Sequence, residues 1–257
     1  MADPRDSADE LAGTEQPFVA HLMELRDRIL YALGGVGVCM VLLAIWPGPS
    51  GLIDLIAVPI RAHMPPDVKL IAVGVFTPFF VPLKVLMMAG LLLALPWVIY
   101  QIWAFVAPGL YTHEKRLILP LVVASVLLFC TGMAFAYFLV FPVVFSFMAA
   151  VTPSGVAMMT DIDKYLSFVM GMFVSFGCAF EVPVVVVLLV RMGVLSVDKL
   201  RTGRPYVIVG AFIVAAIVTP PDVLSQTMLA VPLCLLYEIG ILAATVIERR
   251  RAREVTA

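Results

Sequence analysis

The stretch LSFVMGMFVSFGCAFEVPVVVVLLV, residues 166–190, decides the fold, because its only charged side chain is Glu181. A run of this length is enough to cross a bilayer as a helix. An ionisable side chain at the bilayer centre costs about 2.5–3.5 kcal/mol on insertion scales, so Glu181 should face protein or water and is a candidate functional residue. Pro183 lacks a backbone donor, so we expect a kink near the acid.

The composition places the whole chain in a membrane. Hydrophobic residues make up 62% of the 257 residues, against about 45–50% in soluble domains. The four cysteines lie far apart within apolar runs, so no disulfide framework and no metal-ligand spacing is visible. We therefore expect neither a metal nor another cofactor.

Six apolar runs indicate six transmembrane helices, at residues 29–46, 83–106, 117–141, 166–190, 206–218 and 224–247. The fifth run has the length of only about 20 Å of helix, against a hydrocarbon core of about 30 Å. It ends at the turn Thr219-Pro220-Pro221-Asp222. We predict an all-α integral membrane protein with a disordered acidic tail at 1–16, a six-span domain at 17–248 and a basic tail at 249–257.

Basic residues sort to one side of these spans. Thirteen of the 17 Lys and Arg residues lie before the first span, after the last one, or in the gaps 107–116 and 191–205. The positive-inside rule therefore places both termini in the cytoplasm. On the other side, the gaps 47–82 and 142–165 are apolar and broken by prolines, so we expect interfacial helices and turns that cap the outer face.

Four side chains are expected near the membrane interfaces. Tryptophan is enriched where a membrane meets water, and a lysine near a span end can extend its ammonium to the interface. The residues concerned are Trp46, Trp97, Trp103 and Lys84.

No enzyme motif is present: there is no G-x-S-x-G, no H-E-x-x-H and no Gly-rich phosphate loop. The three histidines lie outside the predicted spans, so an enzyme is not expected. A proton- or ion-coupled small-solute transporter that uses Glu181 is an alternative, because a buried acid beside a helix break is typical of that class. No inverted repeat accompanies it.

Two acids on the basic side are further candidates. Glu24 lies in an amphipathic segment before the first span, four residues from Arg28, and Glu114 lies in the second cytoplasmic gap. On spacing alone, Glu24 could be part of a solvated helix face and Glu114 a charge at a helix N-terminus. Two acids on a basic face also suit a cationic peptide, because a carboxylate can pair with a guanidinium through two hydrogen bonds.

Five sequence blocks follow in a characteristic order: HLMELRDR at 21–28, YQIWAFVAPGLY at 100–111 with EKR at 114–116, FG at 176–177 with FEVP at 180–183, RPY at 204–206, and TPPD at 219–222 with SQT at 225–227. In these blocks, over residues 17–248, the chain resembles TatC, the multispanning subunit of the twin-arginine protein translocase.

The resemblance implies a cup-like bundle of six spans with short fifth and sixth helices, in the bacterial cytoplasmic (inner) membrane. It implies that the protein binds the twin-arginine signal peptides of folded substrates, whose export is driven by the proton-motive force. The implied partners are TatA- and TatB-type single-span subunits, further copies of the chain and membrane lipid. No nucleic acid is implied.

The resemblance also assigns roles to residues of this sequence. Signal-peptide binding falls to Glu24, Arg26, Phe105 and Glu114, and the intramembrane polar site to Glu181. Contact with partner subunits falls to Thr219 and Gln226, and outer-face functions to Pro59 and Asp222. Ala216 departs from the family pattern, in which a larger methionine can occupy this position of the fifth helix.

Overall fold

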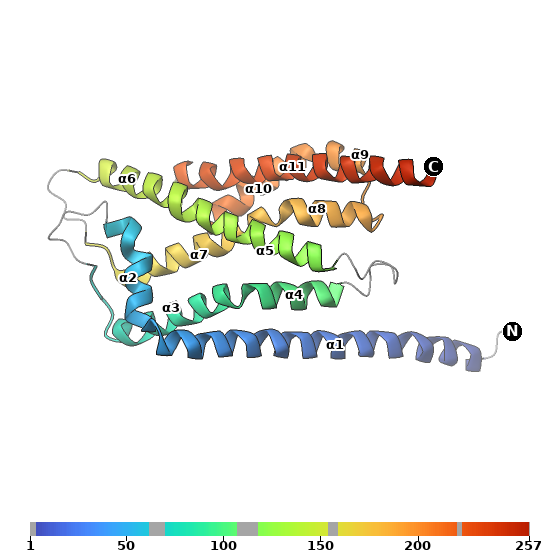
Figure 1. Ribbon diagram of the computed structural model, residues 1–257, viewed down its shortest axis with the longest axis horizontal. Helices are drawn as coiled ribbons and strands as arrows, with labels where there is room; N and C mark the ends of the chain where they lie inside the picture. The colour runs from blue at the N-terminus through green and yellow to red at the C-terminus, as the bar shows by residue number, and fades with distance from the viewer. Residues whose placement is uncertain (1–3, 62–69, 107–117, 154–158, 220–222, 257) are drawn as a thin grey trace.

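The computed structural model describes residues 4–61, 70–106, 118–153, 159–219 and 223–256, and of residues 4–18, 59–61, 118 and 250–256 only the backbone. Helices make up all regular structure in this part, apart from one isolated parallel bridge between Ile71 and Asp161. The N-terminal end of α1 (Pro4–Ile45) and the C-terminal end of α11 (Val223–Thr256) lie at the same end of the molecule (Figure 1). The fold is a membrane helical bundle, as predicted.

The first predicted span belongs to the continuous helix α1, whose apolar part, Val19–Ile45, is long enough to cross a membrane. The helix already begins at Pro4, so residues 4–16 are helical where the sequence led us to expect a disordered tail. This stretch contains alanine, leucine and glutamate, which favour helix, and it continues into the span. After α1, α2 (Gly48–Arg61) runs across the bundle axis at the end away from the termini (Figure 1).

The second predicted span is a bent pair of helices. α3 (Thr77–Leu93) and α4 (Leu95–Val106) meet at an angle of 59°. Pro96 is the second residue of α4, and a proline there removes a backbone donor and collides with the carbonyl four residues earlier. The span predicted over 83–106 is therefore divided near Ala94.

The third span is longer than predicted. α5 (Ile118–Phe135) continues through the π-helical segment η3 (Ala136–Val140) into α6 (Phe141–Val151). Pro142 has no N–H to donate, and in the wider π turn the Phe141 N–H instead reaches the carbonyl of Ala136, five residues back. The helix thus passes the predicted end at residue 141 and includes ten residues of the outer gap 142–165, for which we expect interfacial helices and turns.

The fourth span breaks at the predicted place. α7 (Ile162–Phe180) ends at Glu181, and α8 (Val182–Arg191) begins directly after it, with Pro183 as its second residue. The Glu181 N–H donates to the carbonyl of Cys178 at 3.1 Å, which tightens the last turn of α7. Glu181 therefore lies at the junction of two helices.

The last two apolar helices differ in length. A short helix, α9 (Val197–Thr202), precedes α10 (Arg204–Val218), which has 15 residues and confirms the short fifth helix. α11 has 34 residues, and its apolar part, Val223–Arg249, is long enough to span a membrane. The expectation of a short sixth helix is wrong, because α11 continues into the basic tail without a break.

Glycines at the crossing of α5 and α7 hold these two helices in close contact. A Cβ on Gly132 would collide with the backbone carbonyl of Phe176, and a Cβ on Gly177 would collide with the ring of Phe129. Away from the termini, Lys84 Nζ lies 2.6 Å from Asp163 Oδ1 and joins α3 to α7. The break at Glu181 thus lies next to a tightly packed part of the bundle.

Candidate functional site

Polar side chains of α1 and α4 meet at the end of the bundle where the termini lie. Arg28 Nη1 donates to Gln101 Oε1 at 3.2 Å, and Arg28 Nη2 lies 3.4 Å from Glu24 Oε1. The rings of His21 and Phe105 stack with their centroids 4.4 Å apart and an angle of 16° between their planes. We call these five residues the inner-end site.

The Glu24 carboxylate in this site is accessible, because about a third of its side chain is exposed (34%). Gln101 is buried (4% exposed), so the amide has a fixed environment. The arrangement therefore holds one guanidinium between a carboxylate and an amide, a setting in which charge-assisted hydrogen bonds are strong. The spacing in the sequence suggested the Glu24–Arg28 pair but did not predict that Gln101 joins it. The only sequence feature that marks Gln101 is its amide within an apolar run.

The other predicted members of this site are placed differently. Arg26 points to its neighbour: its Nε and Nη2 lie 2.9 and 2.7 Å from Asp27 Oδ1, and 67% of its side chain is exposed. The structure therefore does not bring Arg26 to Glu24. Glu114 lies outside the described residues, as does Asp222, and Pro59 belongs to α2 with its side chain outside the described part.

A second set of polar side chains lies near the break between α7 and α8. Glu181 Oε1 is buried and accepts no hydrogen bond from the described residues. Ser125 of α5 lies near the Glu181 carboxyl and is buried, with 1% of the residue exposed. Trp103 of α4 donates its indole N–H to Ser125 Oγ at 3.0 Å. We call these three residues the Glu181 network.

The Glu181 network corrects one prediction. Trp103 is only 8% exposed and bonds a buried serine, so it is not an interface anchor, whereas Trp46 is 81% exposed. Sequence reasoning missed Ser125, because one serine within an apolar run gives no signal until its neighbour across the bundle is known.

The two predicted partner-contact residues lie where α10 meets α11. The Thr219 hydroxyl donates to the carbonyl of Ala215 at 2.8 Å, and Gln226 Nε2 donates to the carbonyl of Phe212 at 3.2 Å. Both bonds go to carbonyls of α10, so the structure brings the two residues to the same short helix. Ala216 lies on the exposed side of that helix.

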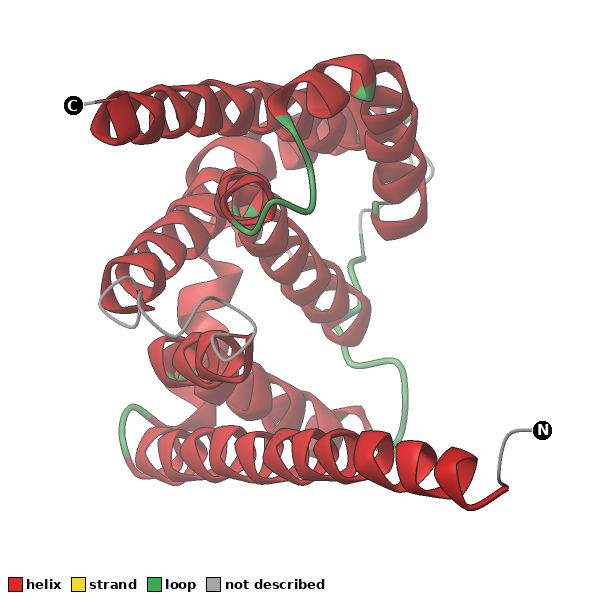
Figure 2. Cartoon of the chain, turned by 90° about the vertical axis from the view of Figure 1, so that its right-hand side faces the viewer, coloured by secondary structure: helices red, strands yellow, loops and turns green. Residues whose placement is uncertain are grey.

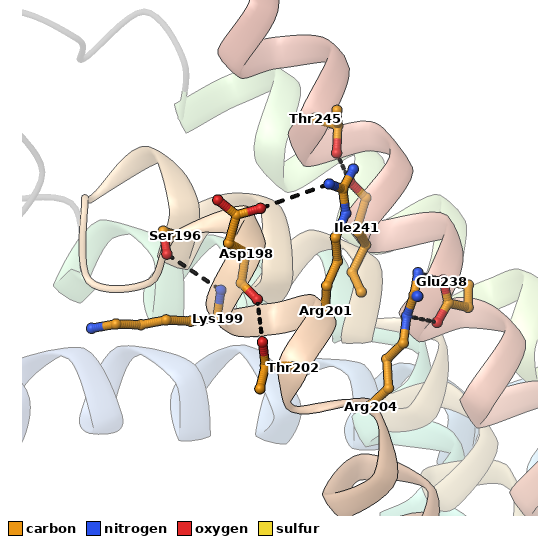
Figure 3. Close-up of polar contacts among 9 residues, drawn as sticks. All are labelled: Ser196, Asp198, Lys199, Arg201, Thr202, Arg204, Glu238, Ile241 and Thr245. Carbon is orange, nitrogen blue, oxygen red and sulfur yellow. Dashed lines mark hydrogen bonds and ion pairs between the residues drawn. The ribbon is translucent and has the colours of Figure 1, made fainter.

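An ion pair fixes the other end of α10 to α11. Arg204 Nε lies 2.7 Å from Glu238 Oε1, and Arg204 Nη2 lies 2.7 Å from Glu238 Oε2, which makes the pair bidentate (Figure 3). The buried Tyr237 hydroxyl donates to the carbonyl of Leu200 in α9 at 2.9 Å. These contacts give Glu238 a structural role.

The fold and these groups define a multi-pass membrane protein with one polar site at the end of its bundle and another at a helix break. A family model described as "Sec-independent protein translocase protein (TatC)" matches residues 20–232. The chain belongs to the TatC family, and as a member it is a component of a protein translocase.

Relatives and solved structures agree with this assignment. The chain is 51% identical over 236 residues to a Sec-independent protein translocase protein TatC of Azotobacter chroococcum, covering 92% of each chain. It is 49% identical over 226 residues to the TatC protein of Escherichia coli K12, covering 88% of this chain and 87% of the relative. A crystal structure described as "Twin Arginine Translocase Receptor- TatC" superposes with a TM-score of 0.77 at 36% identity, covering 88% of this chain and 98% of the other.

Proposed function

We propose that this protein is the signal-peptide receptor of a twin-arginine translocase, and that the inner-end site binds an arginine of the signal peptide. One observation carries the proposal: a guanidinium, that of Arg28, already lies between Glu24 and the buried Gln101. An arginine from a peptide has the same planar fork of donors and can use the same acceptors. The crystallised relative is itself described as a twin-arginine translocase receptor.

Charge and ring stacking both favour a cationic peptide at this place. The Arg28–Glu24 distance of 3.4 Å is long for a charge-assisted bond, so Glu24 retains capacity for a second guanidinium. Next to it, the stacked rings of His21 and Phe105 present aromatic surface. Arginine side chains stack on such surfaces, so Phe105 would orient the bound peptide and Glu114 would pair with its second arginine.

The remaining predicted sites would act after signal binding. Glu181 would bond a polar group of an inserted helix, and Thr219 with Gln226 would contact TatA- and TatB-type single-span subunits. We propose that the protein also serves as their assembly platform, that copies of the chain associate within the receptor complex, and that the proton-motive force drives export. Asp222 and Pro59 would act at the outer face.

The location proposed is the bacterial cytoplasmic membrane, with both termini in the cytoplasm. Two observations support this orientation. The N-terminal end of α1 and the C-terminal end of α11 lie at the same end of the bundle (Figure 1), and the predicted topology places most basic residues there. Figure 2 views the bundle from its right-hand side in Figure 1, which is the proposed cytoplasmic end. The small-solute transporter is not favoured, because the family assignment points to protein translocation.

Photocrosslinking tests the receptor role. A twin-arginine signal peptide with a photoreactive residue beside its arginines should crosslink to the wild-type protein, and Glu24→Ala or Glu114→Ala should lose the product. Asp27→Ala is the matched control, because Asp27 is the next acid along α1 and pairs only with exposed Arg26 among the described residues. Unchanged crosslinking in both glutamate variants would contradict the proposal.

A second experiment tests whether Glu181 acts at a later step than signal-peptide binding at the inner-end site. We expect Glu181→Ala to reduce export of a folded substrate more than it reduces signal-peptide crosslinking, since Glu181 lies in another part of the bundle. Export is measured as the processed substrate outside the membrane. Equal losses of both quantities would argue against a later role for Glu181.

A further inference from the structure

An apolar cavity lies toward the end of the bundle away from the termini. It has a volume of about 750 Å³, and its lining comes from α1, α2, α3, η3 and α7. Leu52 of α2, Met88 of α3 and Phe173 of α7 are buried side chains of this lining, and we call them the cavity floor. Helix α2 crosses the bundle at this end (Figure 1) and forms one wall of the cavity.

The cavity opens toward the membrane. Leu55 of α2, Leu93 of α3 and Phe138 of η3 belong to the lining but are each more than half exposed, so they mark its opening. Leu93 and Phe138 lie in segments that are long and apolar enough to cross a membrane. Lipid hydrocarbon therefore surrounds the opening. An apolar cavity offers water too few polar partners to hold it, so hydrocarbon is what enters.

Two tyrosines fix α2 in place over the cavity. The Tyr137 hydroxyl donates to the carbonyl of Leu55 at 3.4 Å. This carbonyl needs such a donor, because the residue four positions later is Pro59, which has no N–H. The Tyr165 hydroxyl donates to the carbonyl of Ile56 at 2.7 Å. Tyr137 is the one polar side chain of the described lining, and its bond keeps the hydroxyl engaged, so the cavity keeps an apolar surface.

We propose that this cavity binds one acyl chain of a phospholipid from the leaflet on that side. At about 30 Å³ for each water-sized group, its volume corresponds to about 25 methylene-sized groups, which is enough for one chain and too little for two. A transmembrane helix about 10–12 Å wide and about 30 Å long occupies about 2,400–3,400 Å³, several times the space available. The size therefore selects a lipid chain as the occupant. This site goes beyond the proposed function and does not depend on it.

An ion pair lies at the depth of the lipid headgroup. Lys84 Nζ is 2.6 Å from Asp163 Oδ1, and both side chains are partly exposed. Lys84 precedes Met88 by four residues in α3, so it lies about 6 Å nearer the membrane surface along that helix. An ammonium has three donors and a carboxylate has several acceptor sites, so each can bind a second group. A phosphatidylethanolamine headgroup supplies a phosphate for Lys84 and an amine for Asp163, and its chain runs inward to the cavity floor.

Photolabelling of the full-length protein in phosphatidylethanolamine vesicles tests the site. The label is a phosphatidylethanolamine with a diazirine at the end of one chain, and mass spectrometry maps the labelled residues. We expect label on the cavity floor at a level at least equal to that on Ile217 of α10, an exposed residue that reports lipid free in the bilayer. A second lipid, with the diazirine next to its headgroup, should leave the floor unlabelled. An unlabelled floor with the first lipid, or equal labelling by both lipids, would overturn the proposal.

A variant that fills the cavity gives the matched comparison. Ala89 of α3 lines the cavity and is half-buried, so Ala89→Phe places a ring in the space that the chain needs. Floor labelling should fall about tenfold in this variant, while label on Ile217 shows that the protein is assembled in the membrane. Ala134→Phe is the control and should behave as the wild type, because Ala134 is an exposed residue of α5 outside the lining. Floor labelling that persists in Ala89→Phe would contradict a bound chain, and if this variant does not assemble, the two lipids compared on the wild type decide.

Native membranes decide between a lipid and a protein as the occupant. Cells that produce the protein are supplied with a diazirine fatty acid, which they incorporate into their phospholipids. We expect the same floor labelling there, because the cavity is too small for a helix. A floor labelled in vesicles but unlabelled in native membranes would show that a protein occupies the cavity, and would overturn the proposal. Neither result bears on the receptor role, which the crosslinking of Glu24→Ala tests separately.

Discussion

At the scale of single residues, Arg28 is the centre of the inner-end site because one guanidinium bonds two helices. It pairs with Glu24 within α1 and donates to Gln101 of α4. The first contact follows from spacing, since residues four apart on a helix are neighbours. The second was not predictable, because no local rule links positions 73 residues apart. The same limit hid Trp103 and Ser125, whereas Glu181 was evident as a lone charge in an apolar run.

Removal of Arg28 should destabilise the protein. We expect Arg28→Ala to lower the free energy of unfolding by about 1–2 kcal/mol, because the buried Gln101 amide loses a charged donor. Arg26→Ala is the control and should change it by less than about 0.5 kcal/mol, since Arg26 is exposed and bonds only its neighbour among the described residues. Reversible unfolding of the detergent-solubilised protein measures both, and equal losses would show that the bond to Gln101 contributes nothing.

At the scale of helices, the apolar runs predicted where helices lie but not where they bend. The division of the second span near Ala94 and the π segment before Pro142 both follow from prolines within apolar runs. Hydropathy alone does not tell whether such a proline ends a helix, bends it or is accommodated by a wider turn, because neighbouring helices supply the missing contacts. The prediction therefore placed residues 142–151 in a gap of interfacial helices and turns, and gave no bend for the span at 83–106.

The crossing of α5 and α7 gives a prediction at this scale. Gly132→Ala should cost about 1–3 kcal/mol in stability, because the new Cβ meets the Phe176 backbone, which cannot rotate away. Gly171→Ala, on the other helix of the crossing, α7, is the control: nothing lies within 4 Å of its Cβ position, so it should be neutral or slightly stabilising. Thermal unfolding of both variants measures the difference, and equal behaviour would show that the crossing is not tight.

The ion pair between α10 and α11 gives a second prediction at this scale. Arg204 and Glu238 are each nearly half exposed, so their coupling energy should be about 1 kcal/mol or less. A double-mutant cycle with Arg204→Gln and Glu238→Gln measures it, and the exchanged pair Arg204→Glu with Glu238→Arg should recover part of the loss. A coupling energy of zero would show that the ion pair does not help to hold α10 against α11.

At the scale of the whole molecule, charge placement and chain direction agree. The N-terminal end of α1 and the C-terminal end of α11 lie at the same end of the bundle, at opposite edges of it (Figure 1). The predicted topology gathers the basic residues at that end. Six spans are predicted, but among the described residues four helices are long and apolar enough to cross a membrane, or five if the bent pair α3–α4 is one span, because α10 is shorter. The orientation stays a prediction from the charge placement. The length of α11 was not predictable, since a basic tail gives no signal of where its helix ends.

Cysteine labelling tests this topology. With the native cysteines replaced, Ser7→Cys and Thr256→Cys should react with a membrane-impermeant maleimide only in inside-out vesicles. Val75→Cys, at a position that is 90% exposed near the opposite end, should react only in intact spheroplasts. The reverse pattern would invert the orientation and place the inner-end site outside the cell.

The central claim is that the inner-end site recognises arginine in a signal peptide, and peptide binding to the purified protein tests it most directly. Affinities of an Arg-Arg peptide and a matched Lys-Lys peptide are compared for the wild type and for Glu24→Gln. We predict that the wild type prefers Arg-Arg by about tenfold or more, because lysine lacks the planar fork, and that Glu24→Gln weakens binding and removes most of the preference. Undiminished affinity and preference in Glu24→Gln would contradict the account.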